Sequence, residues 1–136
     1  MLSKSRAVVL DSWSIIAYLE DEPAGAKVER IIADAHEQGT PLMTTVVSAG
    51  EVWYIVARAA SPDDADEAVR DIRRLGVEFI EADWALTRAA ADIKSGAKMS
   101  YADCFAAALA AERNGVLVTG DTEFKQVASK IKVHWI

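Results

Sequence analysis

Two stretches of sequence decide the fold: Ala7-Val-Val-Leu-Asp-Ser12 near the start of the chain and Val116-Leu-Val-Thr-Gly-Asp121 near its end. Each is a short run rich in β-branched residues that leads directly to an acidic side chain. A continuous apolar run of this length is typical of a strand buried on both faces of a parallel sheet. We therefore expect strands at 6–10 and 116–119, with Asp11 and Asp121 at their carboxyl ends.

The segments around these two strands alternate between helical and strand patterns. Further strands are expected at 41–44, 77–80 and 132–135, and helices at about 13–20, 25–38, 45–60, 62–75, 84–94, 101–111 and 123–128. The helix at 45–60 is apolar almost all round, so we expect most of it to be buried. This order predicts one α/β domain over residues 1–136, with a mostly parallel sheet covered by helices on both faces. Ligands bind such sheets beyond the carboxyl ends of the strands.

Composition restricts the possible functions. The 136 residues include 15 Lys and Arg against 21 Asp and Glu, a net charge of −6 that argues against a protein coating nucleic acid. This net charge is compatible with a nuclease in which a bound metal ion supplies the positive charge that nucleic acid needs. No uncharged apolar run approaches the roughly 18 residues of a membrane span, so we expect no membrane association.

Two further features bear on the compartment. The apolar run that follows Lys4 and Arg6 ends at Asp11 and is too short for a signal-peptide core. A single cysteine, Cys104, excludes a disulfide within the chain and agrees with a reducing compartment. We therefore expect the protein to be cytoplasmic.

Four acidic residues interrupt apolar segments. Asp11 and Asp121 follow strands, while Glu51 and Asp103 are isolated charges near the starts of two apolar helices. A carboxylate in such a segment costs free energy unless it is paired, hydrogen-bonded or bound to a cation. The four positions are therefore candidates for one shared site.

Helix capping is the alternative explanation for each acid. Ser100 with Asp103 fits the S-x-x-[DE] capping box, and so does Ser48 with Glu51. Asp11 fits an N-cap, and Asp121 after a glycine fits an Asx-turn. The two interpretations are compatible, since a helix N-terminus also favours a carboxylate.

If the acids converge, they require a positive partner, because several carboxylates within about 4 to 6 Å cannot all stay ionised alone. Oxygen ligands without His or Cys select hard ions, Mg²⁺ or Mn²⁺, over zinc. Such an ion neutralises phosphate charge and activates water for attack on phosphorus. The pattern therefore favours phosphoryl chemistry.

The surroundings of these acids resemble the four acidic motifs of PIN-domain ribonucleases, and most of all the small toxins of VapBC-type toxin–antitoxin modules. The motifs are VVLDSWSIIAYL around Asp11, VSAGEVWYI around Glu51, MSYADCFAAALA around Asp103 and LVTGDTEF around Asp121. The resemblance extends from the first expected strand to the segment around Phe124.

This resemblance implies a three-layer α/β/α sandwich and an endoribonuclease that depends on Mg²⁺ or Mn²⁺ and cuts structured RNA, such as transfer or ribosomal RNA. It also implies a homodimer and a small antitoxin that folds over the active site. Asp11, Glu51, Asp103 and Asp121 match the metal-binding acids of the family. The resemblance is weaker at Ser12 and Thr119, which match positions where the family often has a hydroxyl that helps to orient a metal-bound water. Glu123 is an alternative to Asp121 as the fourth acidic ligand.

Other residues are less informative. We expect four aromatic side chains to lie in the core or in a dimer interface: Trp13, Trp53, Tyr54 and Trp84. Trp13 and Tyr54 lie close to the acidic motifs, so contacts with the antitoxin are the alternative role for these two. The basic residues best placed to meet RNA are Arg88, Lys94, Lys98, Lys125, Lys130 and Lys132. His36 and His134 lie outside the motifs, and we expect neither to be catalytic.

The serious rival is a domain of the same fold that binds RNA or protein without catalysis. Such a degenerate domain is expected to have lost one or more of the acids, and this chain keeps all four. The glycine-rich loops that bind dinucleotides or nucleoside triphosphates are absent from the sequence.

Overall fold

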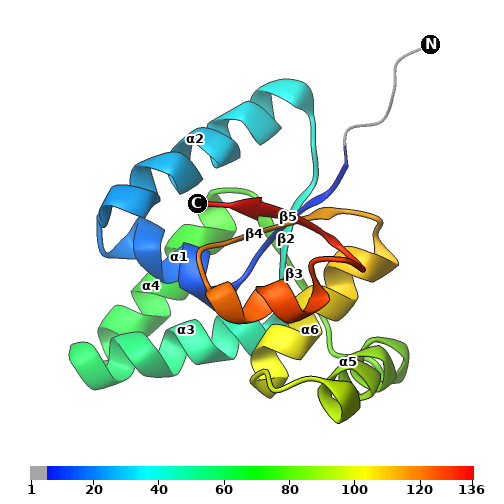
Figure 1. The fold of residues 1–136 in the computed structure, drawn as a ribbon. Coiled ribbons are helices and arrows are strands. Elements are labelled where there is room, and N and C mark those ends of the chain that lie inside the picture. Colours follow the sequence, from blue (N-terminus) through cyan, green and yellow to red (C-terminus); the bar gives the residue numbers. More distant parts are fainter. Residues whose placement is uncertain (1–5) are drawn as a thin grey trace.

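The computed structural model describes residues 6–136 and contains, over that range, five strands that all run parallel. The strands are β1 (Val8–Leu10), β2 (Leu42–Thr45), β3 (Val77–Ile80), β4 (Val116–Thr119) and β5 (Lys132–Trp135). Their spatial order is β3-β2-β1-β4-β5, so the first strand lies in the middle of the sheet (Figure 1). The predicted α/β fold is confirmed, and the sheet of the described residues is wholly parallel.

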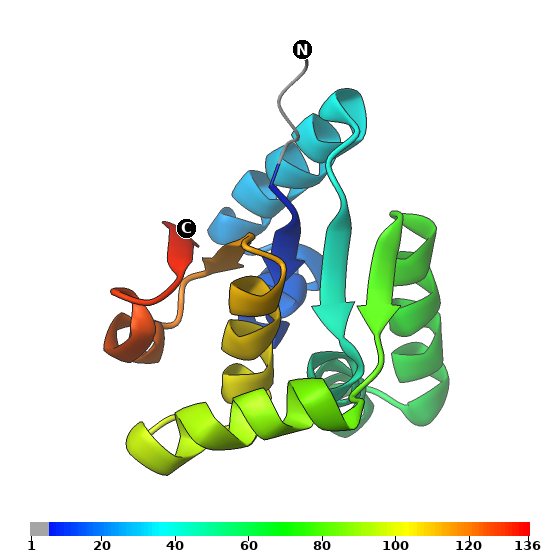
Figure 2. The ribbon, with the colours of Figure 1, turned by 90° about the vertical axis from the view of Figure 1, so that its right-hand side faces the viewer.

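The helices cover both faces of this sheet. They are α1 (Ser12–Leu19), α2 (Pro23–Gln38), α3 (Val46–Ala59), α4 (Pro62–Arg74), α5 (Trp84–Gly96), α6 (Tyr101–Glu112) and the 3₁₀ helix η1 (Thr122–Val127). Figure 2 shows α5 and α6 on one face and α1, α2 and α4 behind the strands. The segment predicted as a short helix at 123–128 is thus a 3₁₀ helix, and the other elements differ from prediction by a few residues at their ends.

Each face of the sheet has its own apolar core. Side chains alternate along a strand, so Val9 points into the core under α5, α6 and η1, while Leu10 points into the core under α1, α2, α3 and α4. Leu117 and Val118 of β4 divide between the same two cores. The unbroken apolar runs of these strands therefore reflect burial on both faces, and the three-layer arrangement is confirmed.

Helix α3 is less buried than its sequence predicts. Of its residues only Ser48, Ala49 and Val52 are buried, and Tyr54 is 41% exposed. The prediction of a largely buried helix was wrong because α3 lies at the border of the molecule, where it packs along α4 and leaves one apolar side uncovered (Figure 1). Trp84, expected in a core or interface, is 73% exposed at the start of α5.

The strand order places a topological switch point between β1 and β4. The chain proceeds from β1 to β2 and β3 on one side, whereas β4 and β5 lie on the other. Asp11 and Asp121 follow the two strands that flank this point. Switch points are where open parallel sheets form their ligand-binding crevices.

No helix within residues 6–136 combines the length and the apolar character that a bilayer span demands. Lys4, considered above for a targeting signal, lies outside the described residues.

The contact between the first turn of α2 and the end of α1 yields a stability prediction. A Cβ at Gly25 would lie 2.4 Å from the Ala17 carbonyl oxygen, a backbone atom that cannot move alone. We expect Gly25→Ala to lower the free energy of unfolding by about 1 to 3 kcal/mol through overpacking, measured by thermal and denaturant unfolding.

Gly50 provides the matched control, because it lies within α3 and a Cβ there would meet nothing within 4 Å. Gly50→Ala should raise the free energy of unfolding by about 0.5 to 1 kcal/mol. A Gly25→Ala protein as stable as the wild type would contradict the close packing of α1 on α2.

Candidate active site

Asp11 lies at the centre of the site but beneath its surface. It follows β1, is 1% exposed and caps α1 by accepting a hydrogen bond from the Ser14 amide at 2.8 Å. The Thr119 hydroxyl donates to its other carboxylate oxygen. Burial raises the pKa of Asp11 to about 6, against the opposing effect of these hydrogen bonds.

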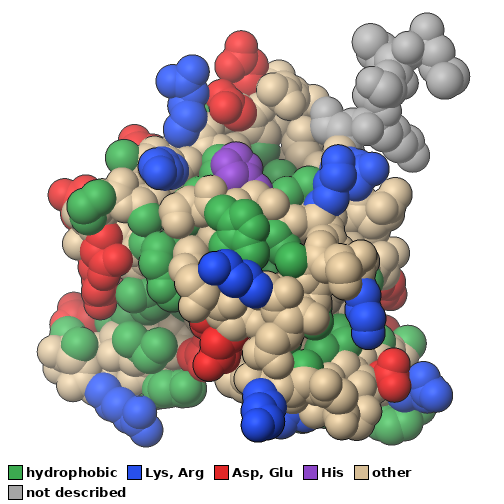
Figure 3. All heavy atoms as spheres, viewed as in Figure 1, with side chains coloured by type: hydrophobic (Ala, Val, Ile, Leu, Met, Phe, Trp, Pro, Cys, Tyr) green, Lys and Arg blue, Asp and Glu red, His purple; other side chains and the backbone are tan. Residues whose placement is uncertain are grey.

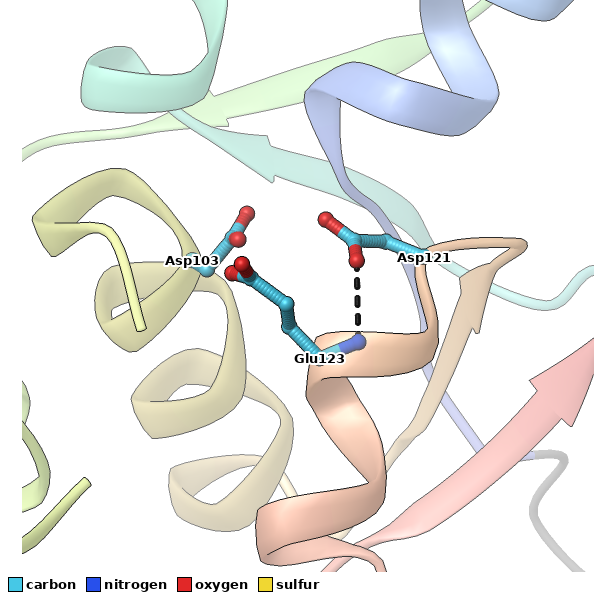
Figure 4. A group of neighbouring side chains, drawn as sticks. All are labelled: Asp103, Asp121 and Glu123. Carbon is cyan, nitrogen blue, oxygen red and sulfur yellow. Dashed lines mark hydrogen bonds between the residues drawn. The ribbon is translucent and has the colours of Figure 1, made fainter. Parts of the chain in front are cut away.

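Three other acids converge directly above it. Asp103 lies in the first turn of α6, Asp121 caps η1 and Glu123 lies in the first turn of η1. One carboxylate oxygen from each lies within 4.8 Å of the others, and Figure 4 shows the three side chains directed toward one another. The Glu123 amide donates to Asp121 Oδ1 at 2.9 Å, which fixes the turn that brings both acids to Asp103.

Glu51 joins the same site from α3. The Ser12 hydroxyl donates to Glu51 Oε1, and the Tyr54 hydroxyl donates to Oε2 at 3.3 Å. The charge of Glu51 raises the pKa of the Tyr54 phenol, so Tyr54 stays a donor. Both oxygens of Glu51 are thus oriented by neighbouring hydroxyls.

These side chains line an open cavity of about 380 Å³. Its lining residues are Ser12, Trp13, Ile16, Glu22, Glu51, Ile55, Ser100, Asp103, Asp121 and Glu123. None of these is Lys, Arg or His. Figure 3 shows acidic side chains gathered in a hollow between η1 and α3.

The like charges are strong enough to alter protonation. Burial, and then the charge of Asp121, raise the pKa of Asp103 to about 7, with smaller contributions from Asp11 and Glu51. The hydroxyl of Ser100 opposes this rise. The pKa of Asp103 thus responds to the charges of the other three predicted acids, Asp11, Glu51 and Asp121.

Capping explains two of the acids in part. Asp11 is an N-cap, as the alternative interpretation expected. Asp121, expected in an Asx-turn, accepts from the Glu123 amide two residues on and also caps η1, and each acid uses one oxygen for its cap. The cap of α6 is the Ser100 hydroxyl, which accepts from the Asp103 amide at 3.1 Å. The cap of α3 is Thr45, not Ser48, so a capping box involving Glu51 was wrong.

The arrangement fits a divalent cation. Carboxylate oxygens from three residues lie within 4.8 Å of one another, and Glu51 lines the same cavity. The donors are all hard oxygens, which suit Mg²⁺ or Mn²⁺. Asp11 does not line the cavity, so the residues best placed to contact an ion are Asp103, Asp121, Glu123 and Glu51.

Some features of the site were not anticipated from the sequence. Gln126 joins η1 to the loop before α6: its side chain accepts from the Lys98 amide at 2.9 Å and donates to the Lys98 and Glu123 carbonyls at 3.1 and 3.2 Å. Tyr54 contacts Glu51, a pairing that the spacing of three residues on one helix could have indicated.

The six basic residues that were expected to meet RNA around the site do not line the acidic cavity. Arg88 and Lys130 instead line a second cavity of about 520 Å³ at α5, α6 and η1. The two histidines are also absent from the acidic cavity, and His36 Nε2 is bonded to the Leu75 carbonyl instead.

The raised pKa of Asp103 predicts how stability depends on pH. Between its ordinary value of 3.8 and about 7 the folded protein holds a proton that the unfolded chain releases, so this contribution to stability falls as pH rises through that window. In metal-free protein, Asp103→Asn should therefore be more stable than wild type at pH 8, on the order of 2 to 4 kcal/mol, with the difference vanishing near pH 4.

Mg²⁺ should raise the melting temperature of the wild type at pH 8 and have a smaller effect on Asp103→Asn, because the ion relieves the repulsion that the substitution removes. Differential scanning calorimetry at both pH values measures this. Glu112→Gln, exposed at the other end of α6, is the control and should show no such pH dependence. An equal wild-type-to-variant difference at both pH values would contradict the repulsion.

Solved structures with the same fold are numerous. VapBC2 from Rickettsia felis bound to a promoter DNA fragment matches with a TM-score of 0.76 and 15% identity over 94% of this chain and 97% of that chain. The sarcin–ricin loop cleaving toxin VapC20 of Mycobacterium tuberculosis matches with a TM-score of 0.68 and 18% identity over 89% and 95%. VapBC-1 from nontypeable Haemophilus influenzae gives 0.71 and 17% over 95% and 97%. No curated protein matches at a significant level.

The sequence itself also matches a family model. The model is described as PIN domain, and its match covers residues 8–130, from the first residue of β1 to a point beyond η1. All the acids of the cavity fall inside this range. The chain therefore belongs to the PIN domain family.

Proposed function

We propose that this single-domain protein is a metal-dependent endoribonuclease and the toxin of a toxin–antitoxin pair. The observation that carries the proposal is the convergence of Asp103, Asp121 and Glu123 within 4.8 Å in a cavity that no basic residue of the range 6–136 lines. Carboxylates this close repel one another, one of them on the buried Asp103, and a divalent cation is the partner that this donor set suits. The family match and the VapC-like fold support nuclease chemistry.

RNA is the proposed substrate because VapC20, which shares the fold, is a toxin that cleaves the sarcin–ricin loop. Structured RNA such as ribosomal or transfer RNA is the corresponding substrate class here. A Mg²⁺ or Mn²⁺ ion held by Asp103, Asp121, Glu123 and Glu51 would neutralise charge on the scissile phosphate and lower the pKa of water.

The chain's own residues then have distinct tasks. Ser12 and Tyr54 orient Glu51, and Thr119 connects Asp11 to the Asp121 amide, from which its hydroxyl accepts at 3.0 Å. Asp11 thereby fixes the turn that carries Asp121 and adds negative charge beneath the ion. Since no histidine lines the cavity, a carboxylate is the side chain available to accept a proton from attacking water.

We also propose a small antitoxin partner, a homodimer and a cytoplasmic location. Several matching structures are VapBC complexes, which supports the antitoxin. Large hydrophobic side chains are exposed and available for protein contacts: Tyr54, Trp84, Tyr101 and Trp135. The buried free thiol of Cys104 is compatible with a reducing compartment.

Incubating the purified chain with total RNA and Mn²⁺, then mapping the fragment ends, tests the reaction. We expect cleavage that EDTA abolishes. Asp103→Asn and Asp11→Asn should each lower the rate at least about 100-fold, because they remove charge at nearly constant volume.

Comparing the cleavage rates of Asp121→Asn and Glu123→Gln then shows which residue is the fourth acidic metal ligand, since its substitution should lower the rate more. Glu112→Gln on the exposed end of α6 should cut like the wild type. Wild-type rates in both Asp103→Asn and Asp11→Asn would refute the proposed roles of Asp103 as a metal ligand and of Asp11 as the residue that fixes the Asp121 turn. RNA binding without cleavage would favour the non-catalytic alternative.

The toxin role predicts a phenotype in cells. Expression of the chain alone should arrest growth, and co-expression of the small gene adjacent to it should restore growth by supplying the antitoxin. Colony counts after induction measure both effects. The Asp103→Asn variant should allow growth at the same protein level; growth arrest by that variant would separate toxicity from the acidic site.

A further inference from the structure

One face of α3 connects the acidic cavity to a single cation. Glu51, Tyr54 and Arg58 follow one another at helical spacing. The Tyr54 hydroxyl donates to Glu51, and the Arg58 guanidinium lies over the Tyr54 ring, 4.9 Å from its centroid. In Figure 3 the surface along α3 extends from the acidic hollow past apolar side chains to basic ones.

Arg58 has no acidic partner among the described residues, a state it shares with Arg73, which lies over Phe79, but only the aromatic support of Arg58 is hydrogen-bonded to an acid of the cavity. Arg70 and Arg74 of α4 are paired with Glu67, and Arg30 of α2 is paired with Asp34. Those charges are compensated within the protein. The Arg58 head group instead lies over an aromatic face, and its N–H donors make no hydrogen bond within the described residues.

The position of Arg58 suits a polyanion that enters the cavity. Residues 51 and 58 are two helical turns apart, about 10 Å along the axis, and Arg58 lies beside the acidic cavity without lining it. A cation bound by the acids would compensate one phosphate, whereas the neighbouring phosphates of an RNA strand would face a lining without positive charge. Ile55 lines the cavity on the same helix and makes the surface between the two charges continuous.

We infer that Arg58, supported by Tyr54, binds a backbone phosphate of the RNA strand next to the scissile one. This inference rests on the proposed ribonuclease function and adds a substrate contact to it. A guanidinium is suited to the contact because it binds phosphate oxygens in a bidentate manner. A protein segment that neutralises the acidic cavity would carry positive charge itself, so Arg58 would repel it.

Binding measured without cleavage tests the inference. The probe is a fluorescein-labelled single-stranded RNA about 12 nucleotides long, and the protein is Asp103→Asn with Mg²⁺, so that the probe stays intact. We expect adding Arg58→Gln to weaken binding about 3- to 10-fold and to reduce the slope of log K against log salt by about 0.7, the value for one phosphate contact on a single strand.

Two comparisons isolate the contact. Arg113→Gln removes the same charge at the far end of α6 from Asp103, and it should change binding less than twofold. Arg58→Lys keeps the charge but loses the planar fork, so it should restore binding only in part. Equal losses in Arg58→Gln and Arg113→Gln would overturn the inference, since a general charge effect would then explain both.

Steady-state kinetics on bulk transfer RNA supply the second readout. Arg58→Gln in the otherwise wild-type protein should raise KM about 3- to 10-fold with little change in kcat, the pattern of a contact made equally in the ground and transition states. An unchanged KM together with weaker antitoxin binding would overturn the inference in favour of a protein contact. If the wild type cuts no RNA, the proposed function fails, while the binding measurement still decides whether Arg58 contacts RNA.

Discussion

Electrostatic repulsion among carboxylates is the constraint on which the structure of the site depends. Burial first, and then the charges of Asp121, Asp11 and Glu51, raise the pKa of Asp103 to about 7. Such an arrangement destabilises the metal-free fold, so it is retained only because the rest of the chain holds it in place. Marginal stability makes a cost of a few kcal/mol substantial for a domain of this size.

The fold meets this cost by giving the acids local structural roles. Asp11 caps α1 and Asp121 caps η1, so the turns after β1 and β4 form only with these side chains directed inward. Thr119 connects them, because its hydroxyl donates to Asp11 and accepts from the Asp121 amide. Gln126 then holds η1 against the loop before α6. Capping and site formation are therefore one set of contacts.

The sequence predicted the sheet and the meeting of the acids because both follow from local pattern and topology. Apolar runs ending in Asp11 and Asp121 place those acids at strand tips, and parallel strands share one carboxyl edge. The depth of each side chain could not be predicted. Asp11 is turned inward by its hydrogen bonds to Ser14 and Thr119 and does not line the cavity. Glu123 is held near Asp103 by the turn in which its amide donates to Asp121. The exposed side of α3 depends on how α4 packs, which no local pattern records.

The position of Arg58 follows from the same electrostatics. A cation in contact with the acids would act as a permanent counterion, and at about 4 Å its attraction is worth roughly 4 kcal/mol near a protein surface. It would relieve the repulsion and compete with a divalent ion for the carboxylates. Arg58 is instead exposed on Tyr54 outside the cavity lining, where water and salt screen its attraction, so the acids keep their affinity for an ion. The site needs an acidic cavity that binds a metal ion and, beside it, a positive side chain that contacts the RNA, so the two must be kept apart. Two turns of α3, with Tyr54 between Glu51 and Arg58, provide that separation.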